Sequence, residues 1–116
     1  MATVNFQGSW VARGLHQTLW PAMGAADSGL AQSPGQLSDK TIQFSGTWNG
    51  ATAILQGSND GSVWFGLNQP DGTPISTTVD ALFQVLENTK HVRPVTSGGG
   101  GSTSVNARLL EKGGDI

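Results

Sequence analysis

Hydrophobic and polar residues alternate over short runs along most of the chain, and turn residues separate the runs. In residues 40–48, for example, Ile42 and Phe44 alternate with polar residues, as in a strand with one buried face. Runs of this kind predict strands at residues 40–48, 51–56, 63–67, 74–77, 82–86, 91–96 and 104–110. Their spacing of about ten residues is typical of an all-β sandwich or barrel.

We therefore predict an all-β fold, an antiparallel β-sandwich that is either jelly-roll-like or immunoglobulin-like. Its core covers residues 40–112, and residues 113–116 form a polar tail. In the run 104–110, Val105, Ala107 and Leu109 point toward one face. In the run 63–67 the same alternation predicts that Val63, Phe65 and Leu67 share the core face and that Trp64 faces away from it.

Turn residues support these boundaries. Asn49-Gly50 can supply the two positive φ angles of a type I′ hairpin turn. Asn59-Asp60-Gly61 and Pro70-Asp71-Gly72 are further turn sequences. The stretch "SGGGGS" at residues 97–102 lies between two predicted strands, and we interpret it as the glycine-rich tip of a hairpin.

Residues 1–39 have a different pattern. Residues 13–20 could form a strand that Pro21 ends, and residues 21–38 are rich in glycine and proline, with Asp27 as their one charge. A long loop inside a compact domain is usually functional or disordered. We predict an N-terminal strand and an extended arm that is ordered by another surface, with a flexible loop as the alternative.

Charged residues make up 12% of the chain, against roughly 25% in typical soluble domains. A neutral hydrogen-bonding surface, flexible segments, or coverage by neighbouring subunits would each explain this deficit, since interface cores are poor in charge. The net charge of −2 and the scattered cationic residues favour no nucleic-acid partner. No apolar run approaches the ~20 residues of a membrane span, so no membrane partner is expected.

The residue types that carry catalysis or bind metals do not cluster in the sequence. His16 and His91 have no acidic residue at a metal-ligand spacing, and the chain has no cysteine. Asn59, Asp60 and Asp71 could supply oxygen ligands to calcium, but such a site needs six or more oxygens. We expect no catalytic residues, no cofactor and no metal site, and hence no enzyme.

Apolar residues that could bind a partner are more evident. Trp10, Trp20 and Met23 lie in the predicted arm, and Trp64 follows the "GSNDGS" turn. An exposed tryptophan can anchor an interface or stack on a sugar. Trp64 with Asn59 and Asp60 could therefore form a carbohydrate site, while Trp64 could equally pack beside its own hairpin.

The order of these motifs resembles a known family. "FSGTWNGATAILQGSNDGSVWFGL", "DGTPIS" and "VLENTKHVRPVTSGGGGSTSVNARLL" together resemble a small all-β structural protein encoded in many tailed-bacteriophage genomes. The resemblance covers roughly residues 40–112 and implies a virion component. A shorter likeness, "GSNDGSVW", is similar to a hairpin of discoidin-type carbohydrate- or lipid-binding domains.

The resemblance implies a location in the virion, after assembly in the host cytoplasm. We expect a capsid decoration or cement protein that binds the major capsid protein and neighbouring copies of itself, as a homo-oligomer on the virion. Two alternatives stay open at this point. One is a structural protein of the tail or the head-to-tail junction, and the other is a carbohydrate-binding β-sandwich module.

Overall fold

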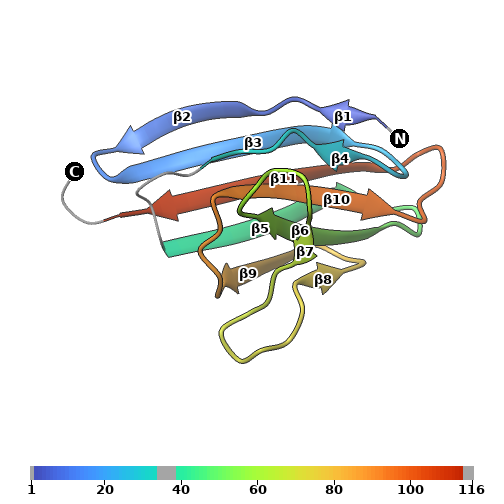
Figure 1. Ribbon diagram of the computed structural model, residues 1–116. Helices are drawn as coiled ribbons and strands as arrows, with labels where there is room; N and C mark the ends of the chain where they lie inside the picture. Colours follow the sequence, from blue (N-terminus) through green and yellow to red (C-terminus); the bar gives the residue numbers. More distant parts are fainter. Residues whose placement is uncertain (1, 34–38, 114–116) are drawn as a thin grey trace.

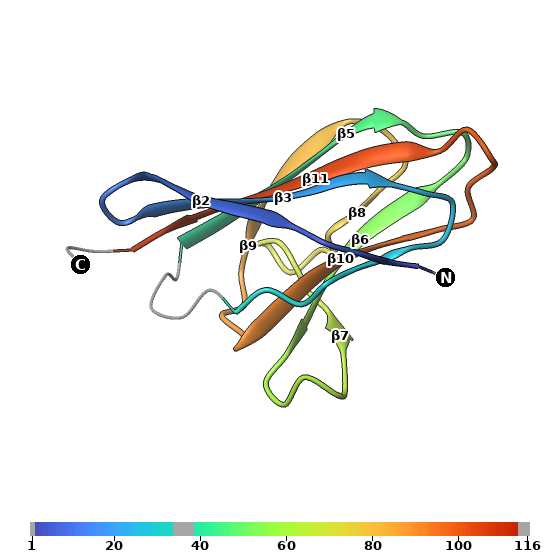
Figure 2. The same ribbon diagram turned by 90° about the horizontal axis from the view of Figure 1, so that it is seen from above.

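Strands form two β-sheets in the computed structural model, which describes residues 2–33 and 39–113. Sheet A has the order β1-β4-β10-β6-β7, with β8 also paired to β6, and sheet B has the order β2-β3-β11-β5-β9. The two sheets pack face to face (Figures 1 and 2), and no helix occurs in the described residues. The strands are β1 (Thr3–Val4), β2 (Gln7–Ala12), β3 (Leu15–Met23), β4 (Ser28–Gly29), β5 (Asp39–Thr47), β6 (Thr52–Ser58), β7 (Phe65–Gly66), β8 (Ser76–Thr77), β9 (Ala81–Val85), β10 (His91–Ser97) and β11 (Ser104–Lys112).

The chain crosses repeatedly from one sheet to the other. From β3 to β6 successive strands alternate between sheets, and β9, β10 and β11 alternate again. Sheet B then carries the order β3-β11-β5-β9 opposite β4-β10-β6 with β7 and β8, which is the strand order of a jelly roll. The predicted sandwich is confirmed, and of its two forms the topology is that of a jelly roll.

The core lies between the sheets and follows the alternation that the sequence predicts. Ile42 and Phe44 of β5 are fully buried, as are Val105, Ala107 and Leu109 of β11. The remaining buried members of the cluster are Trp20, Met23, Ala53, Leu55, Leu67, Ile75, Val85 and Val92. Inward residues of facing strands thus share one apolar layer, which drives the two sheets together.

The N-terminal third belongs to both sheets, which corrects the predicted division into an arm (1–39) and a body (40–112). Strand β3 lies between β2 and β11 in sheet B, and β1 pairs in parallel with β4 in sheet A. Among the glycines and prolines that suggested an arm, Pro21 lies at a bulge and Gly29 packs closely against Trp20. Residues 34–38 of the predicted arm, residue 1, and residues 114–116 of the tail lie outside the described residues.

Pro21 lies inside β3 and does not end it. The register of β3 against β11 shifts between Val105 and Ala107, and Ala22 there has a φ of 51°. The Ala22 amide donates to Asn106 Oδ1 at 2.9 Å. A β-bulge thus accommodates the proline, and the strand continues to Met23.

The Asn49-Gly50 turn has the predicted conformation but a different role. Asn49 and Gly50 have φ angles of 44° and 85°, and the Ala51 amide donates to the Trp48 carbonyl at 2.8 Å. The flanking strands β5 and β6 nevertheless lie in different sheets. The turn therefore joins the two sheets instead of closing a hairpin.

The glycine-rich loop at residues 98–101 joins β10 to β11 and likewise connects the two sheets. Its Gly100 amide donates to the Asn49 carbonyl at 3.0 Å. A Cβ at Gly100 would lie 2.4 Å from Asn49 Nδ2, so the two loops pack closely and a side chain at Gly100 would displace that of Asn49. The predicted hairpin tip is wrong for the same reason as at Asn49-Gly50, because the pattern does not say which sheet each strand joins.

Replacing Gly29 with alanine should destabilise the fold. An added Cβ would lie 2.6 Å from Pro94 Cδ and 2.7 Å from Trp20 Cδ1, and overpacking of this kind typically costs about 1–3 kcal/mol. Gly66→Ala is the matched control, because nothing lies within 4 Å of its added Cβ and its effect should stay within about 0.5 kcal/mol. Urea denaturation of both variants measures the difference, and equal stabilities would contradict the packing described for Gly29.

Candidate interaction surfaces

The sequence predicted four partner-binding residues, three tryptophans and one methionine, and the structure places them in different environments. Trp20 and Met23 are fully buried in the core, and Trp20 Nε1 donates to the Leu30 carbonyl at 2.9 Å. These two residues hold the chain's own sheets together and cannot serve as anchors for another subunit. The sequence nominated them because it did not reveal that β3 is a central strand.

Trp10 is accessible, with 61% of its surface exposed. It lies on β2, whose six residues are all exposed, and its ring packs edge-on against His16 with a centroid distance of 5.0 Å. Its role in binding a partner stays a prediction, and the accessibility of its ring is compatible with that role.

Trp64 is half-buried on the outer side of sheet A. The Arg93 guanidinium lies 4.1 Å from the centre of the Trp64 ring, and Arg93 Nε donates to Gln56 Oε1 at 2.9 Å. A cation–π contact of this kind covers one face of the indole. Trp64 therefore packs against its own sheet, which is the simpler of the two roles that the sequence left open.

The loop between β6 and β7 is braced by its own side chains. Asp60 Oδ1 accepts hydrogen bonds from the amides of Ser62 and Val63 at 2.8 and 2.9 Å and from Ser58 Oγ at 2.9 Å. Asn59 Oδ1 accepts from the Lys90 amide at 3.0 Å. The bonds from Val63, Ser62 and Ser58 stabilise the carboxylate and lower the pKa of Asp60 to about 2.

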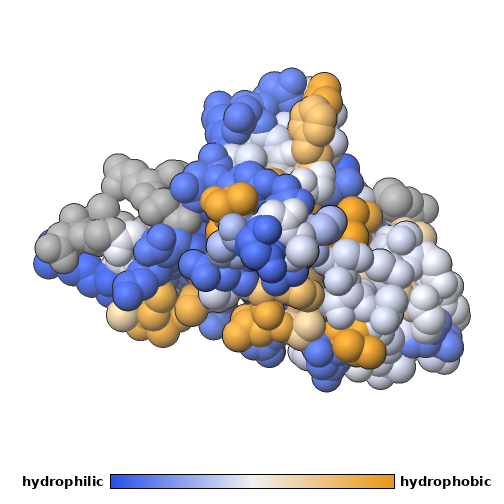
Figure 3. Space-filling view, turned by 90° about the horizontal axis from the view of Figure 1, so that it is seen from below, coloured by the Kyte–Doolittle hydropathy of each residue, from blue (hydrophilic) through white to orange (hydrophobic). Residues whose placement is uncertain are grey.

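The same loop presents Val63 and Phe65 to solvent, and we name these two residues the β6–β7 knob. Val63 is 55% and Phe65 68% exposed. The loop projects from the body in Figures 2 and 3, and Figure 3 shows hydrophobic residues along one side of the projection. The prediction that Val63, Phe65 and Leu67 share the core face is thus wrong except at Leu67. In this run only Phe65–Gly66 pairs with β6, and this short strand lies at the edge of sheet A. The dense turn residues just before this run are the signal that its strand is short.

A shallow hollow lies beside the knob, between the loop and residues 87–89. It is lined by Asp60, Val63, Phe65, Glu87 and Thr89, among other residues. Both Glu87 oxygens accept from Asn68, at 2.8 Å from its amide and 2.6 Å from Nδ2, and Thr89 Oγ1 donates to the His91 carbonyl. These polar groups around the hollow therefore form hydrogen bonds within the chain, and the apolar knob is the main accessible feature of the hollow.

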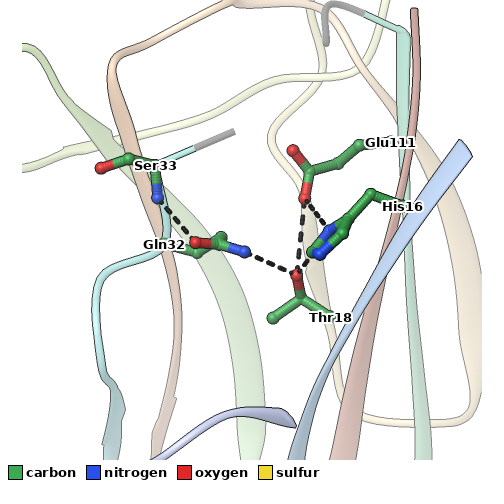
Figure 4. A network of polar contacts seen from close by, with 5 residues as sticks. All are labelled: His16, Thr18, Gln32, Ser33 and Glu111. Carbon is green, nitrogen blue, oxygen red and sulfur yellow. Dashed lines mark hydrogen bonds and ion pairs between the residues drawn. The ribbon is translucent and has the colours of Figure 1, made fainter. Parts of the chain in front are cut away.

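A polar cluster occupies one end of the interior (Figure 4). Glu111 on β11 is fully buried and lies in register between His16 on β3 and Lys40 on β5. Its Oε1 is 3.6 Å from His16 Nδ1 and 3.5 Å from Thr18 Oγ1, and Gln32 Nε2 donates to Thr18 at 3.0 Å. Glu111 Oε2 has no hydrogen-bond partner.

Burial dominates the electrostatics of this cluster. Burial raises the pKa of Glu111, although His16 and Lys40 oppose the rise, and it lowers the pKa of Lys40. Lys40 Nζ donates to Asn88 Oδ1 at 2.6 Å. The sequence did not predict this acidic neighbour of His16, since cross-strand register brings the two together. In the described residues, no three acidic, histidine or cysteine side chains gather to hold a metal.

We expect the Asp60 carboxyl to titrate at about 2. Ser58→Ala removes one of its hydrogen bonds and should raise the pKa toward the ordinary aspartate value of 3.8. Carboxyl carbon NMR measures both values. Asp71, whose pKa Thr73 lowers, is the internal control and should not respond; an unchanged Asp60 would contradict the bracing of the loop.

Glu111 should make stability fall as the pH rises. Its pKa in the folded chain lies above the ordinary glutamate value of 4.5, so its favourable contribution is complete below that value and is lost as pH rises through the folded pKa. The difference in unfolding free energy between the native chain and Glu111→Gln should therefore decline toward neutral pH, as measured by urea denaturation. In a His16→Gln background the decline should extend to higher pH, because His16 lowers the pKa of Glu111; a difference that grows with pH would contradict the assignment.

No protein-family model and no curated protein matches the sequence. Among solved structures, the fold is similar to that of the SPBc2 prophage-derived protein YomS, with a TM-score of 0.66, 12% identity, and coverage of 89% of this chain and 98% of that chain. The PBSX exported protein XepA gives 0.54 at 15% identity, covering 84% of this chain and 38% of XepA. Peruvianin-I, a cysteine peptidase from Thevetia peruviana latex, gives 0.51 at 10% identity, covering 96% and 64%. At these identities the likeness establishes a shared fold, and two of the three proteins are phage-derived.

Proposed function

We propose that this chain is a structural protein of a tailed-bacteriophage particle and that it binds the outside of the major capsid protein shell as a decoration subunit. The order of its sequence motifs and its likeness to two phage-derived proteins support a phage role. The β6–β7 knob, an apolar projection on a weakly charged jelly roll, is the observation that favours binding to another protein. The proposed role is one of binding, without catalysis.

The knob has the properties of an anchor residue pair. Phe65 offers an aromatic side chain that is 68% exposed, and aromatic anchors dominate the energy of many interfaces. The Asp60 hydrogen bonds hold the neighbouring backbone at Ser62 and Val63, so little conformational entropy is lost on docking. A rigid anchor makes each single contact efficient.

Repetition on a shell would strengthen such contacts. A decoration subunit meets many identical binding positions, and joined subunits raise the effective concentration of one another. Modest apolar contacts therefore suffice for stable attachment when they recur by symmetry.

The carbohydrate alternative is less well supported. Arg93 lies over the Trp64 ring, and the Asn59 and Asp60 oxygens accept bonds from the chain itself. A sugar platform would need an open aromatic face and free polar groups beside it. These residues are better explained as bracing for the knob.

Copy number distinguishes a shell subunit from a protein of the tail or head-to-tail junction. Particles of the phage that encodes the chain, purified on a density gradient, are analysed by quantitative gel densitometry against the major capsid protein. A decoration subunit gives a copy number comparable with that of the shell protein. A far smaller ratio would favour the tail or junction, and absence from purified particles would contradict a virion role.

Phe65→Ala should weaken attachment to particles that lack the protein. Loss of an aromatic anchor costs about 2 kcal/mol or more, which is about a thirtyfold rise in Kd. Stability should be nearly unchanged, because the side chain is mostly exposed. Val79→Ala is the matched control, since Val79 is 62% exposed elsewhere. Co-sedimentation with particles gives both affinities, and equal binding by the two variants would contradict the role of the knob.

A further inference from the structure

Strand β2 forms a free edge of sheet B. It spans Gln7–Ala12 and, in the described part of the chain, pairs only with β3. The tip of the β2–β3 hairpin extends past the ends of the sheet A strands in Figure 2. A strand at an edge presents unpaired backbone amides and carbonyls on its outer side, so β2 is accessible to another strand.

The sequence of this edge has no charge or proline that would resist pairing. Residues 7–12 contain no charge and no proline, the usual devices that protect edge strands. Trp10 and Val11 are more than half exposed. A bulge near Val11, between Trp10 and Ala12, interrupts the register but leaves Gln7 to Trp10 regular. The regular part of the edge, Gln7 to Trp10, therefore has neither a charge nor a proline to block another strand.

We propose that the occupant is β2 of a second copy of this chain, paired antiparallel about a two-fold axis at Ser9. Opposed residues in antiparallel strands point to the same face, so a symmetric register must centre on a residue. Centring on Ser9 sets Ser9 against Ser9 and Gly8 against Trp10 of the second copy. The two copies then share one continuous sheet.

The shape of the strand favours this register. Gly8 and Trp10 lie on the same face, where the His16 ring is 3.2 Å from the position of a Cβ at Gly8. The His16 ring therefore covers Gly8 and occupies the space of a side chain there. Trp10 of the second copy, set opposite Gly8, packs against that ring, and an aromatic residue opposite a glycine is a known stabilising pair in sheets. No charge on either strand opposes a like charge.

The other free edge of sheet B is a weaker candidate. The Leu86 amide just after strand β9 donates to the Asn68 carbonyl at 2.9 Å, so another segment of the chain lies beside the end of this edge. Pairing of β2 with β9 would also be head-to-tail and would grow into a filament, whereas pairing of β2 with β2 closes after two copies. A single short strand pair buries less than the roughly 1,200 Å² of a standard interface, so the dimer is weak in solution.

Charge substitutions at Ser9 test the register directly. Because Ser9 faces its own copy, Ser9→Lys and Ser9→Glu each place like charges opposite each other, which weakens the dimer about fivefold. An equimolar mixture of the two variants places opposite charges there and should recover the native dimer. Gln84→Lys on β9 is the matched control and should dimerise as the native chain does.

Sedimentation equilibrium over a concentration series measures each dimer, and circular dichroism confirms that exposed Ser9 tolerates the changes. A native chain that stays monomeric to its solubility limit overturns the proposal. So does a mixture that dimerises no better than its components, or open-ended association that Gln84→Lys abolishes. The inference concerns the isolated chain, so it stands or fails independently of the virion role.

Discussion

The indole of Trp20 connects the two sheets, and the rest of the structure depends on that connection. Trp20 lies on β3 in sheet B, is fully buried, and donates to the Leu30 carbonyl just after β4 of sheet A. Phe6 packs edge-on against it at 5.8 Å, and Gly29 provides the space for its ring. A buried tryptophan with its N–H satisfied supplies both apolar area and direction. The N-terminal strands are thereby part of the core.

This constraint determines which groups remain for other molecules. With β3 between β2 and β11, Trp20 and Met23 are buried in the core, and the most exposed large apolar side chains in the described residues include Trp10 on an edge strand and Phe65 on a projecting loop. The β6–β7 knob and strand β2 are two such places, and they lie on different sheets. In the role and the pairing proposed above, one subunit binds a shell through the knob while it pairs with a copy of itself through β2.

Local signals in the sequence predicted local structure well. The alternation at Ile42 and Phe44 identified core positions, and Asn49-Gly50 adopts the two positive φ angles expected of it. Pairing partners could not be predicted, because a type I′ turn can close a hairpin or join two sheets, and because β3 and β11 are distant in sequence. The meeting of His16 with Glu111 and the exposure of Phe65 depend on those pairings, so sequence patterns missed both.

Native-state hydrogen exchange tests most directly whether the N-terminal third belongs to the core. Amides of β3 that bond to β11 should exchange with the same free energy as those of β10 paired with β6, because both require global unfolding. The exchange free energies of both sets of amides should also fall with the same slope as the denaturant concentration rises over a low range. Exchange of the β3 amides at much lower free energy, while β10 stays protected, would mean that this segment detaches as an arm, and would contradict the account.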